Sequence, residues 1–474
     1  MNRGRSPVIV IGAGWAGLAA AVALVEAGEA VIVIEAAPQA GGRARALTLS
    51  FGGSPVEVDN GQHLLIGAYR DTLALMRRVG VDPQQAMLRM PMKLIGPDGF
   101  FLQAATLPAP FHPLNLAIGL ITARGLPWSH RWAMVRLMRR LQQQGPNTCP
   151  SGMTVSQWLA LQGQPAGLIT RIWAPLCIGA LNTPPDQACA RTFARVLNDA
   201  LLGEAGSADF LMPHGTLSDM LPNPAMSWLE ARGAQVRLRS VSRAVRPDPG
   251  PELDPEMRPD SQKGWLVDTD TGTLAASQVI LAVPPNQVAR LLDQTLSAAQ
   301  RAPFEAFEFE PIATVWLGWE SRLALPAITM LDEDIAAGQH GQWLFARTAP
   351  KDGPVHSLAG VVVSAAGRAQ AQAESPAQAL ATQVAAQVAK QLGCPIPEHA
   401  RAIIDKRATI RCSPDRPRID TDALAPHCPG LFLAGDWVWH DYPATIESAV
   451  RSGLAAANRA VTGSPVRDRS DRGN

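Results

Sequence analysis

Short apolar stretches that predict buried strands recur at three distant places along the chain. In the first, residues 7–35, Val8–Ile11 and Ala30–Ile34 predict strands, with a glycine turn and an alanine-rich helix between them. Similar stretches follow within residues 234–283 and 430–461. Strands that alternate with helices are typical of a parallel sheet in an α/β fold. The pattern therefore predicts one α/β domain assembled from the start, middle and end of the chain.

The material between these pieces predicts a second domain. A chain of 474 residues is long enough for about two or three domains. We predict a discontinuous Rossmann-like domain over residues 1–75, 205–295 and 415–462, and an α+β substrate-binding domain with a helical, lipid-facing part over residues 76–204 and 296–414. Residues 246–263, rich in Pro and Asp, predict a surface hairpin excursion, and the polar residues 463–474 predict a disordered tail.

One part of the second domain is free of acidic residues. No Asp or Glu occurs between Asp98 and Asp186, whereas six arginines do. Within this part, Leu114–Ala123 is an apolar run that we interpret as a short loop. Apolar residues then recur at helical spacing opposite three arginines, which predicts a basic amphipathic helix with either a solvated face or a face on an anionic bilayer. These positions are Met134, Leu137, Met138 and Leu141, opposite Arg136, Arg139 and Arg140.

Charge, cysteine content and the lack of long apolar runs limit which partners and which cellular compartment we expect. Forty-two basic and 41 acidic residues give a net charge of +1, which removes any general argument for a nucleic-acid partner. The six cysteines are scattered without metal-ligand spacing, so we expect free buried thiols and no metal. The chain enters its first strand without a signal-like segment and contains no run of about 18 apolar residues. We therefore expect a cytoplasmic protein whose membrane contact is peripheral, on the inner face of the membrane.

The first glycine turn carries a dinucleotide-binding motif. Gly12-Ala13-Gly14-Trp15-Ala16-Gly17 follows a strand and opens a helix, the context in which this glycine spacing is specific. The first glycine permits the tight turn, the second lets the backbone approach a pyrophosphate, and the third lets the helix pack against the strand. Glu35 ends the second strand, where a carboxylate accepts hydrogen bonds from ribose hydroxyls and disfavours a 2′-phosphate. NADP is therefore not expected at this site.

Two further segments favour FAD over NAD. Gly41-Gly42-Arg43 lets the chain pass close to the dinucleotide and supplies a cation for its phosphate oxygens. Asp59-Asn60-Gly61-Gln62-His63 then offers backbone and polar side chains that we expect beside the isoalloxazine. His63 is either a proton donor or a structural histidine.

The last strand and helix predict the other half of the site. Gly435-Asp436 follows the strand at the carboxyl edge of the sheet, where Asp436 can accept a hydrogen bond from a ribityl hydroxyl. Thr445-Ile446-Glu447-Ser448 begins a helix whose positive end we expect to face the N1–C2=O edge of the flavin. Trp437, Trp439 and Tyr442 lie between these segments and either line the flavin face or pack in the interior.

At these residues the chain resembles the FAD-dependent amine oxidase and carotenoid desaturase superfamily. The resemblance implies non-covalent FAD, a contact between the backbone of Val241 and adenine, and a turn beside the cofactor at Ala282-Val283-Pro284-Pro285. The predicted cofactor-binding residues are Gly12, Ala13, Gly14, Trp15, Ala16, Gly17, Glu35, Ala36, Gly42, Arg43, Gly61, Gln62, Val241, Ala282, Gly435, Asp436, Ala444, Thr445 and Ile446.

A narrower resemblance is to the squalene-associated desaturase-like proteins, the hydroxysqualene dehydroxylases of hopanoid-producing bacteria. It rests on residues 59–69, on Trp173–Cys177 with Ala180-Leu181-Asn182, and on residues 435–447. It implies that reduced FAD converts hydroxysqualene to squalene with loss of water. One departure is Ala174, because an acid is expected at this position in the family.

This resemblance also implies partners and a catalytic group. The substrate is a long isoprenoid lipid without charge, which suits an apolar pocket formed by the acid-free part of the chain. An external electron donor is needed, and the leaving hydroxyl needs a proton, for which His63 and Asp441 are the candidates. Three alternatives stay open: a phytoene-type desaturase that runs the flavin oxidatively, an amine oxidase, and a flavin-binding accessory subunit. An amine oxidase usually has an aromatic cage, for which this chain offers only two tyrosines, Tyr69 and Tyr442.

Overall fold

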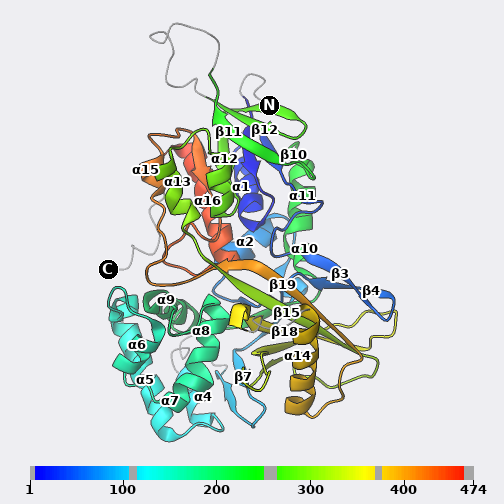
Figure 1. The fold of residues 1–474 in the computed structure, drawn as a ribbon. Coiled ribbons are helices and arrows are strands. Elements are labelled where there is room, and N and C mark those ends of the chain that lie inside the picture. The colour runs from blue at the N-terminus through cyan, green and yellow to red at the C-terminus, as the bar shows by residue number, and fades with distance from the viewer. Residues whose placement is uncertain (1–5, 106–114, 250–263, 369–375, 464–474) are drawn as a thin grey trace.

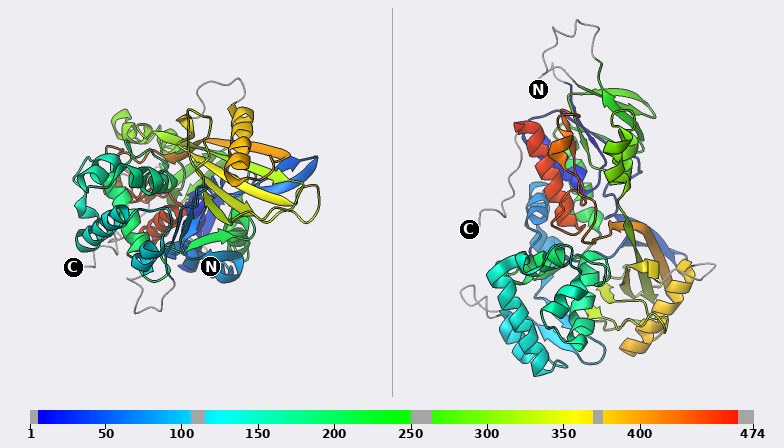
Figure 2. Two further views of the ribbon diagram at one scale, coloured as in Figure 1. Left: turned by 90° about the horizontal axis from the view of Figure 1, so that it is seen from below. Right: turned by 60° about the vertical axis from the view of Figure 1, so that its left-hand side comes forward.

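A parallel sheet at one end of the molecule and an antiparallel sheet with a helical cluster at the other end organise the fold (Figure 1). The computed structural model describes residues 6–105, 115–249, 264–368 and 376–463. Figure 2 shows the helical cluster, in cyan to green, beside the antiparallel sheet, in yellow to orange. The α/β class with a Rossmann-like domain and an α+β domain is therefore confirmed.

The parallel sheet draws its strands from the three parts of the chain that the apolar pattern indicated. Its order is β10-β2-β1-β14-β20, and every neighbouring pair is parallel. The strands are β1 (Val8–Ile11), β2 (Val31–Ile34), β10 (Gln235–Arg237), β14 (Gln278–Leu281) and β20 (Leu431–Leu433). The predicted domain boundaries include all five strands, although their exact positions stay a prediction.

Both faces of this sheet are covered, which explains why its central strands are apolar at every position. Val8 and Val10 point into a core shared with α1 (Trp15–Glu26) and α16 (Ile446–Thr462). Ile9 and Ile11 point into the opposite core, shared with α12 (Pro285–Leu291), α13 (Ala298–Glu305) and a three-stranded sheet. That antiparallel sheet consists of β11 (Ser242–Pro247), β12 (Trp265–Thr269) and β13 (Gly272–Ala276).

The predicted excursion over residues 246–263 is only partly described. Arg246 and Pro247 belong to β11 and pair with Leu266 and Trp265 of β12, so the excursion connects two antiparallel strands. Most of the excursion, residues 250–263, lies outside the described residues. Of the predicted tail over residues 463–474, only Gly463 is described, as the C-cap of α16.

The second sheet is wholly antiparallel, in the order β16-β17-β18-β15-β19. Its strands are β15 (Phe309–Trp319), β16 (Ile328–Met330), β17 (Trp343–Arg347), β18 (Ser357–Ser364) and β19 (His399–Ile410). Helix α14 (Pro376–Leu392) covers one face through Leu380, Val384 and Val388, which share a core with Val315 and Val361 of the sheet.

The acid-free part of the chain forms the helical cluster. Its elements are α4 (Asn115–Thr122), α5 (Trp128–Gln144), α6 (Val155–Leu161), α7 (Ala166–Leu168), a π-helical turn (Ile169–Trp173) and α8 (Ala174–Leu181), followed by α9 (Ala190–Leu201). The amphipathic helix is confirmed as α5, with the predicted apolar positions buried. The interpretation of Leu114–Ala123 as a loop is wrong, because Asn115–Thr122 is helical and Leu120 packs into the core of the cluster.

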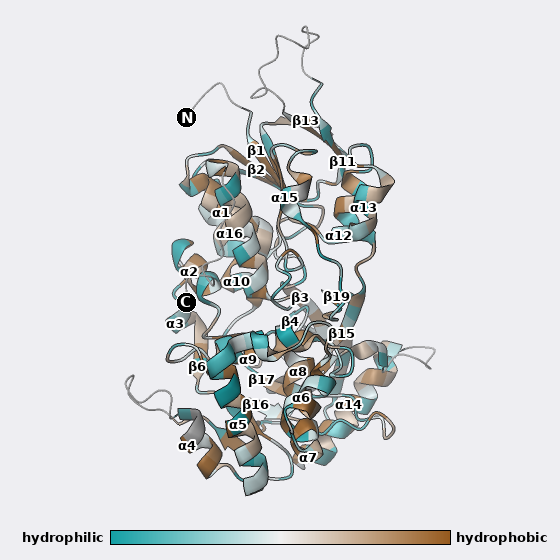
Figure 3. Ribbon diagram, turned by 90° about the vertical axis from the view of Figure 1, so that its left-hand side faces the viewer, coloured by the Kyte–Doolittle hydropathy of each residue, from teal (hydrophilic) through white to brown (hydrophobic). Residues whose placement is uncertain are grey.

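The remaining elements are short. They are β3 (Ala46–Phe51), β4 (Ser54–Asp59), β5 (Leu65–Ile66), α2 (Arg70–Arg78), α3 (Pro83–Ala86), β6 (Met87–Met90), β7 (Lys93–Ile95), β8 (Phe101–Gln103), β9 (Phe210–Pro213), α10 (Leu217–Met220), α11 (Pro222–Glu230) and α15 (Thr421–Leu424). Figure 3 shows α4, mostly hydrophobic, and α5, with hydrophilic stretches, at the end of the molecule farthest from β1. Within the described parts of the chain, we find no helix of the length and apolar character needed to span a bilayer.

Candidate active site

A single cavity of about 890 Å³ reaches from the parallel sheet to the helical cluster. Residues of the first glycine turn, the β20–α16 loop, β15, β19, α8 and α9 line it. Its size is within the range usual for small-molecule sites. Segments from both ends of the sequence therefore meet around one internal space.

The first glycine turn is tightly packed at two of its glycines and open at the third. A Cβ on Gly12, whose φ is +104°, would lie 2.4 Å from the carbonyl oxygen of Ala282, and a Cβ on Gly17 would lie 1.8 Å from that of Gly12. Gly14 has an ordinary φ of −72°, and its nearest neighbour would be the Cα of Gly42 at 3.9 Å. Gly12 and Gly17 are thus needed for packing, whereas Gly14 and Gly42 lie against each other and leave a gap in the cavity wall, a place where only backbone lines the cavity.

Helix α1 begins at this gap with its positive end available to an anion. Gly14 is its N-cap, no side chain caps it, and its first turn contains no acidic residue. Trp15 and Ala16 of that first turn line the cavity, and the indole N–H of Trp15 donates to the carbonyl of Ala44 at 2.9 Å. Backbone N–H groups at a helix start bind phosphate well, so this gap fits the pyrophosphate of FAD.

Glu35 is held in place at the end of β2. Its two carboxylate oxygens accept hydrogen bonds from the backbone N–H groups of Ala13 and Ala37, each at 2.8 Å. Glu35 and Ala36 line the cavity, whereas Ala13 and Gly17 support the turn from behind and do not line it. The carboxylate keeps lone pairs for ribose hydroxyls, because each oxygen can accept a second hydrogen bond.

Val241 and Ala282 line the same end of the cavity, and the contact of Val241 with adenine stays a prediction. Its backbone N–H donates to the Asp270 carboxylate at 3.0 Å, and its carbonyl accepts from the Asp270 N–H at 3.1 Å. Both backbone groups are therefore already engaged, and an adenine contact through them has to share these bonds.

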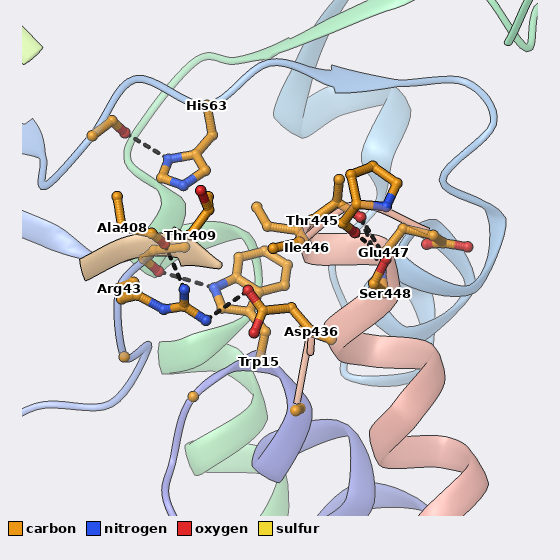
Figure 4. Close-up of a pocket in the computed structure, with 18 of the residues that line it drawn as sticks. Trp15, Arg43, His63, Ala408, Thr409, Asp436, Thr445, Ile446, Glu447 and Ser448 are labelled. Carbon is orange, nitrogen blue, oxygen red and sulfur yellow. Dashed lines mark hydrogen bonds and ion pairs between the residues drawn. The ribbon is translucent and has the colours of Figure 1, made fainter. Parts of the chain in front are cut away.

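Arg43 and Asp436 form an ion pair across the cavity, although 393 positions separate them in the sequence. Arg43 Nη2 lies 2.7 Å from Asp436 Oδ2, and Nη1 donates to the carbonyl of Ala408 on β19 (Figure 4). Burial opposes the charge of Arg43, but the carboxylates of Asp436 and Asp405 together outweigh it, so the pKa of Arg43 is raised. A fixed cation and a carboxylate thus stand together in the middle of the cavity, next to Gly435.

His63 lies on the cavity wall with one ring nitrogen engaged. Its Nδ1 is 2.6 Å from the carbonyl oxygen of Gly61 (Figure 4), and because a carbonyl only accepts, Nδ1 carries the proton. Burial lowers the pKa of His63, and the nearby Arg43 lowers it further. His63 is therefore neutral near pH 7, with an unprotonated Nε2. Next to it, Gln62 also lines the cavity, and its buried Oε1 has no hydrogen-bond partner among the described residues.

The start of α16 forms the wall opposite His63 (Figure 4). Thr445 is the N-cap, and its hydroxyl accepts from the N–H of Ser448 at 3.1 Å. Ala444, Thr445 and Ile446 all line the cavity. Glu447 also lines the cavity, and its carboxylate caps α2, accepting from the N–H groups of Asp71 and Thr72 and from the Thr72 hydroxyl.

Beyond these polar residues, the cavity continues as an apolar chamber. Its walls come from β5, α9, β9 and β17 and include Leu64, Ile66, Phe193, Leu197, Phe210 and Phe345. Leu64 and Ile66 lie within residues 59–69 of the narrower resemblance but were not predicted as site residues. The other four residues carry no motif, so sequence reasoning did not find them. The chamber offers a long apolar ligand a place next to the dinucleotide end.

Two polar residues of the cavity wall, Asn182 and Asp199, were also missed as site residues. Asn182, left-handed with φ of 47°, donates to the Thr409 hydroxyl at 2.9 Å and accepts from the Ala365 N–H at 2.7 Å. Tyr442 donates to Asp199 on α9 at 3.0 Å. Asn182 was part of the narrower resemblance, whereas Asp199 had no sequence signal.

Some predicted residues are not brought to the cavity. Asp441 is exposed and does not line it, although its neighbour Tyr442 does. Of the three aromatic residues in this loop, Trp437 lines the cavity and Trp439 does not. Ala174 begins α8 without lining the cavity, so the missing acid leaves no gap in its wall.

Comparisons with known proteins agree with this architecture. The chain is similar to a hydroxysqualene dehydroxylase from Sinorhizobium fredii, with 28% identity over 96% of this chain and 98% of the relative. A hydroxysqualene dehydroxylase from Rhodopseudomonas palustris is also 28% identical, over 95% and 97%. Cyclohexylamine oxidase from Brevibacterium oxydans has the same fold, with a TM-score of 0.66 and 17% identity over 97% of this chain and 99% of that structure.

A family model described as flavin containing amine oxidoreductase matches residues 15–461, nearly the whole described chain. The residues that form the gap at α1 and the ion pair at Arg43 fit the cofactor that this family uses. The chain belongs to the flavin-containing amine oxidoreductase family and is an FAD-dependent oxidoreductase.

Proposed function

We propose that the protein catalyses the FAD-dependent reduction of hydroxysqualene to squalene. The observation that carries the proposal is the apolar chamber that continues directly from the dinucleotide end of one cavity. A long isoprenoid with a single hydroxyl needs such a chamber, because polar walls without partners would be costly to desolvate. Similarity over nearly the whole chain to two proteins named hydroxysqualene dehydroxylase supports the choice of substrate.

In the proposed reaction, one allylic carbon exchanges a C–O bond for a C–H bond. The hydroxyl takes up a proton and leaves as water, and the carbon takes up a hydride. Bound reduced FAD supplies this hydride. An external electron donor then has to return two electrons for each turnover, and we propose that it is a separate partner.

The residues around the cavity take distinct parts in holding the cofactor. We propose that the N–H groups at the start of α1, beside Gly14 and Gly42, hold the pyrophosphate, and that Glu35 accepts hydrogen bonds from the adenosine ribose. The positive end of α16, at Thr445, then stabilises negative charge on the reduced ring. The Arg43–Asp436 pair orients the linker between these ends through its remaining donors and acceptors.

His63 is proposed to orient the substrate hydroxyl rather than to carry a permanent acidic proton. Its Nε2 is an acceptor in the neutral ring, so it can hold the hydroxyl hydrogen while the oxygen faces other groups. To donate a proton, the ring first has to take up a second one, which its lowered pKa opposes. Asp441 is exposed and does not line the cavity. We therefore assign it no part in protonating the hydroxyl.

The test uses the FAD-loaded full chain under anaerobic conditions. Photoreduced protein is mixed with hydroxysqualene, and squalene is quantified while the flavin spectrum is recorded. We expect squalene and reoxidised flavin in a one-to-one ratio. If hydroxysqualene leaves the flavin reduced, while phytoene reduces the oxidised protein, the proposal is wrong and the desaturase alternative holds.

A matched pair of variants separates binding of the substrate from binding of FAD. Ala180 on α8 lines the cavity, whereas Ala174 at the start of the same helix does not. Ala180→Phe should keep FAD but reduce squalene formation by at least about tenfold, because the larger side chain fills the chamber. Ala174→Phe should leave squalene formation within about twofold of the unmodified protein.

A further inference from the structure

We infer that the corner between α4 and α5 docks the protein on an anionic phospholipid bilayer. The proposed function supplies the reason, since a membrane is where a long isoprenoid accumulates, but the corner itself carries the inference. It consists of Ile121 on α4 and of Trp128, Trp132 and the arginines Arg136, Arg139 and Arg140 on α5.

Three large apolar side chains are exposed together at this corner. Ile121, Trp128 and Trp132 are each 60% exposed, whereas the buried face of α5 fills the core of the helical cluster. Tryptophan is usually well buried in a soluble domain, and exposed tryptophans are enriched where proteins meet the polar–apolar boundary of a bilayer. The two indoles are four residues apart, so they lie on the same face of α5.

The exposed face of α5 changes from aromatic to basic along its length. Arg136 follows Trp132 by one turn, and Arg139 and Arg140 follow by a second. Among the described residues, no carboxylate pairs with these arginines, and Arg140 donates only to the amide oxygen of Gln162. An anionic headgroup layer complements this arrangement, with the indoles at the acyl boundary and the guanidinium groups at the phosphates.

The corner is preorganised rather than loose. Arg131 donates to the carbonyl oxygens of Ile121, Ala123 and Leu126, at 2.5, 2.7 and 2.9 Å, and so fixes the end of α4 against the start of α5. The same guanidinium lies 4.4 Å above the ring of Trp128. The indole is therefore held outward by a contact that does not bury it.

Location and charge favour a bilayer over a second copy of the chain. Figures 1 and 3 place α4 and α5 at the end of the molecule opposite β1, clear of the FAD-binding sheet. A symmetric dimer through this face would bring the same arginines of both copies together, and no acidic residue lies between Asp98 and Asp186 to compensate.

The corner also lies close to the chamber through the packing of the helical cluster. Leu137 and Leu141, on the buried face of α5, share a core with Phe193 and Leu197 of α9. Phe193 and Leu197 in turn line the cavity. One layer of helices therefore separates the proposed bilayer surface from the space that we assign to the lipid substrate.

Flotation of the FAD-loaded full chain with liposomes tests the inference. Vesicles of phosphatidylcholine alone are compared with vesicles that also contain phosphatidylglycerol, at low and high salt. We expect binding to the anionic vesicles that weakens with salt. Replacing Arg136, Arg139 and Arg140 by Gln should weaken this binding on the order of a hundredfold, since each arginine contributes about fivefold at an anionic surface.

Two further variants separate charge from insertion. Trp128→Ser with Trp132→Ser should weaken binding to both kinds of vesicle by at least about tenfold, because apolar area is lost whatever the headgroup charge. The matched control replaces Arg77, Arg232 and Arg401, three exposed arginines outside the corner, by Gln and so removes the same charge. Its binding should stay within about twofold of the unmodified protein.

Several results would overturn the inference. These are no flotation of the unmodified chain, equal loss in the corner and control variants, or a concentration-dependent dimer that the tryptophan variant abolishes. Turnover of hydroxysqualene in detergent micelles is measured in parallel. Squalene formed in micelles without flotation removes the docking surface alone, whereas flotation that depends on the corner without squalene removes the proposed function alone.

Discussion

Replacing Gly14 with alanine should remove FAD while leaving the fold intact, because this glycine makes room for a ligand and not for the protein. Its φ of −72° suits any residue, and an added Cβ would be 3.9 Å from its nearest neighbour. The methyl group would instead stand beside Gly42 in the part of the cavity wall that only backbone lines. Loss of roughly two charge-assisted hydrogen bonds to the pyrophosphate costs about 3 kcal/mol, or on the order of a hundredfold in Kd.

Gly17→Ala is the contrasting variant in the same turn. There the Cβ would lie 1.8 Å from the carbonyl oxygen of Gly12, so the contact between α1 and β1 has to open before any ligand is bound. We expect this variant to be destabilised in the absence of FAD, whereas apo Gly14→Ala should unfold within about 1 kcal/mol of the unmodified apo-protein.

Two measurements on reconstituted apo-protein decide the matter. Quenching of flavin fluorescence gives the Kd for FAD, and urea denaturation of the apo forms gives the free energy of unfolding. A stable Gly14→Ala protein that binds FAD within about threefold of the unmodified Kd would refute the assignment of the pyrophosphate to this gap.

Three other predictions concern buried or cavity-facing ionisable groups. Burial raises the pKa of Asp59 from 3.8 to about 6. The free energy of unfolding should therefore fall by up to roughly 3 kcal/mol as pH rises from about 4 to about 6. Urea denaturation measures this dependence on pH, which should vanish in Asp59→Asn. Glu447→Ala should lower the free energy of unfolding by about 2 kcal/mol or more, because three donors on Asp71 and Thr72 lose their acceptor, and unchanged thermal denaturation would contradict this. His63→Ala should slow turnover with FAD retained. If neutral His63 orients the hydroxyl, the turnover rate of the unmodified enzyme should decrease at pH values below the lowered pKa of His63, whereas a rate that increases in acid would identify an acid role.

The cofactor half of the site could be predicted largely from sequence, because its chemistry depends on local geometry. A strand, three spaced glycines and a helix start are consecutive residues, so Gly12, Gly14 and Gly17 predict a turn without any knowledge of the rest. Glu35 ends the next strand of the same unit. The structure places Glu35, Arg43 and Thr445 around the same cavity. Their contacts with FAD stay a prediction.

The substrate half could not be predicted in this way, because long-range pairing creates it. Phe193, Phe210 and Phe345 belong to three elements with no common motif, and each looks like an ordinary core residue until the sheet and helices meet. Leu114–Ala123 was misjudged for a related reason: its apolar content suited a loop or a helix equally, and packing of Leu120 decided for the helix. Asp441 failed because neighbours in a loop point in different directions, and only Tyr442 faces inward.

The site also explains why the two ends of the chain have to fold together before FAD can bind. Asp436 follows β20, an edge strand that joins the sheet only by pairing with β14. The α16 helix that follows packs so closely on α1 that a Cβ on Gly453 would lie 2.0 Å from the carbonyl oxygen of Ala16. Arg43 therefore gains its carboxylate partner only when the C-terminal segment has docked. We propose that FAD binds across this junction, so by linkage its binding should stabilise the docked C-terminal segment.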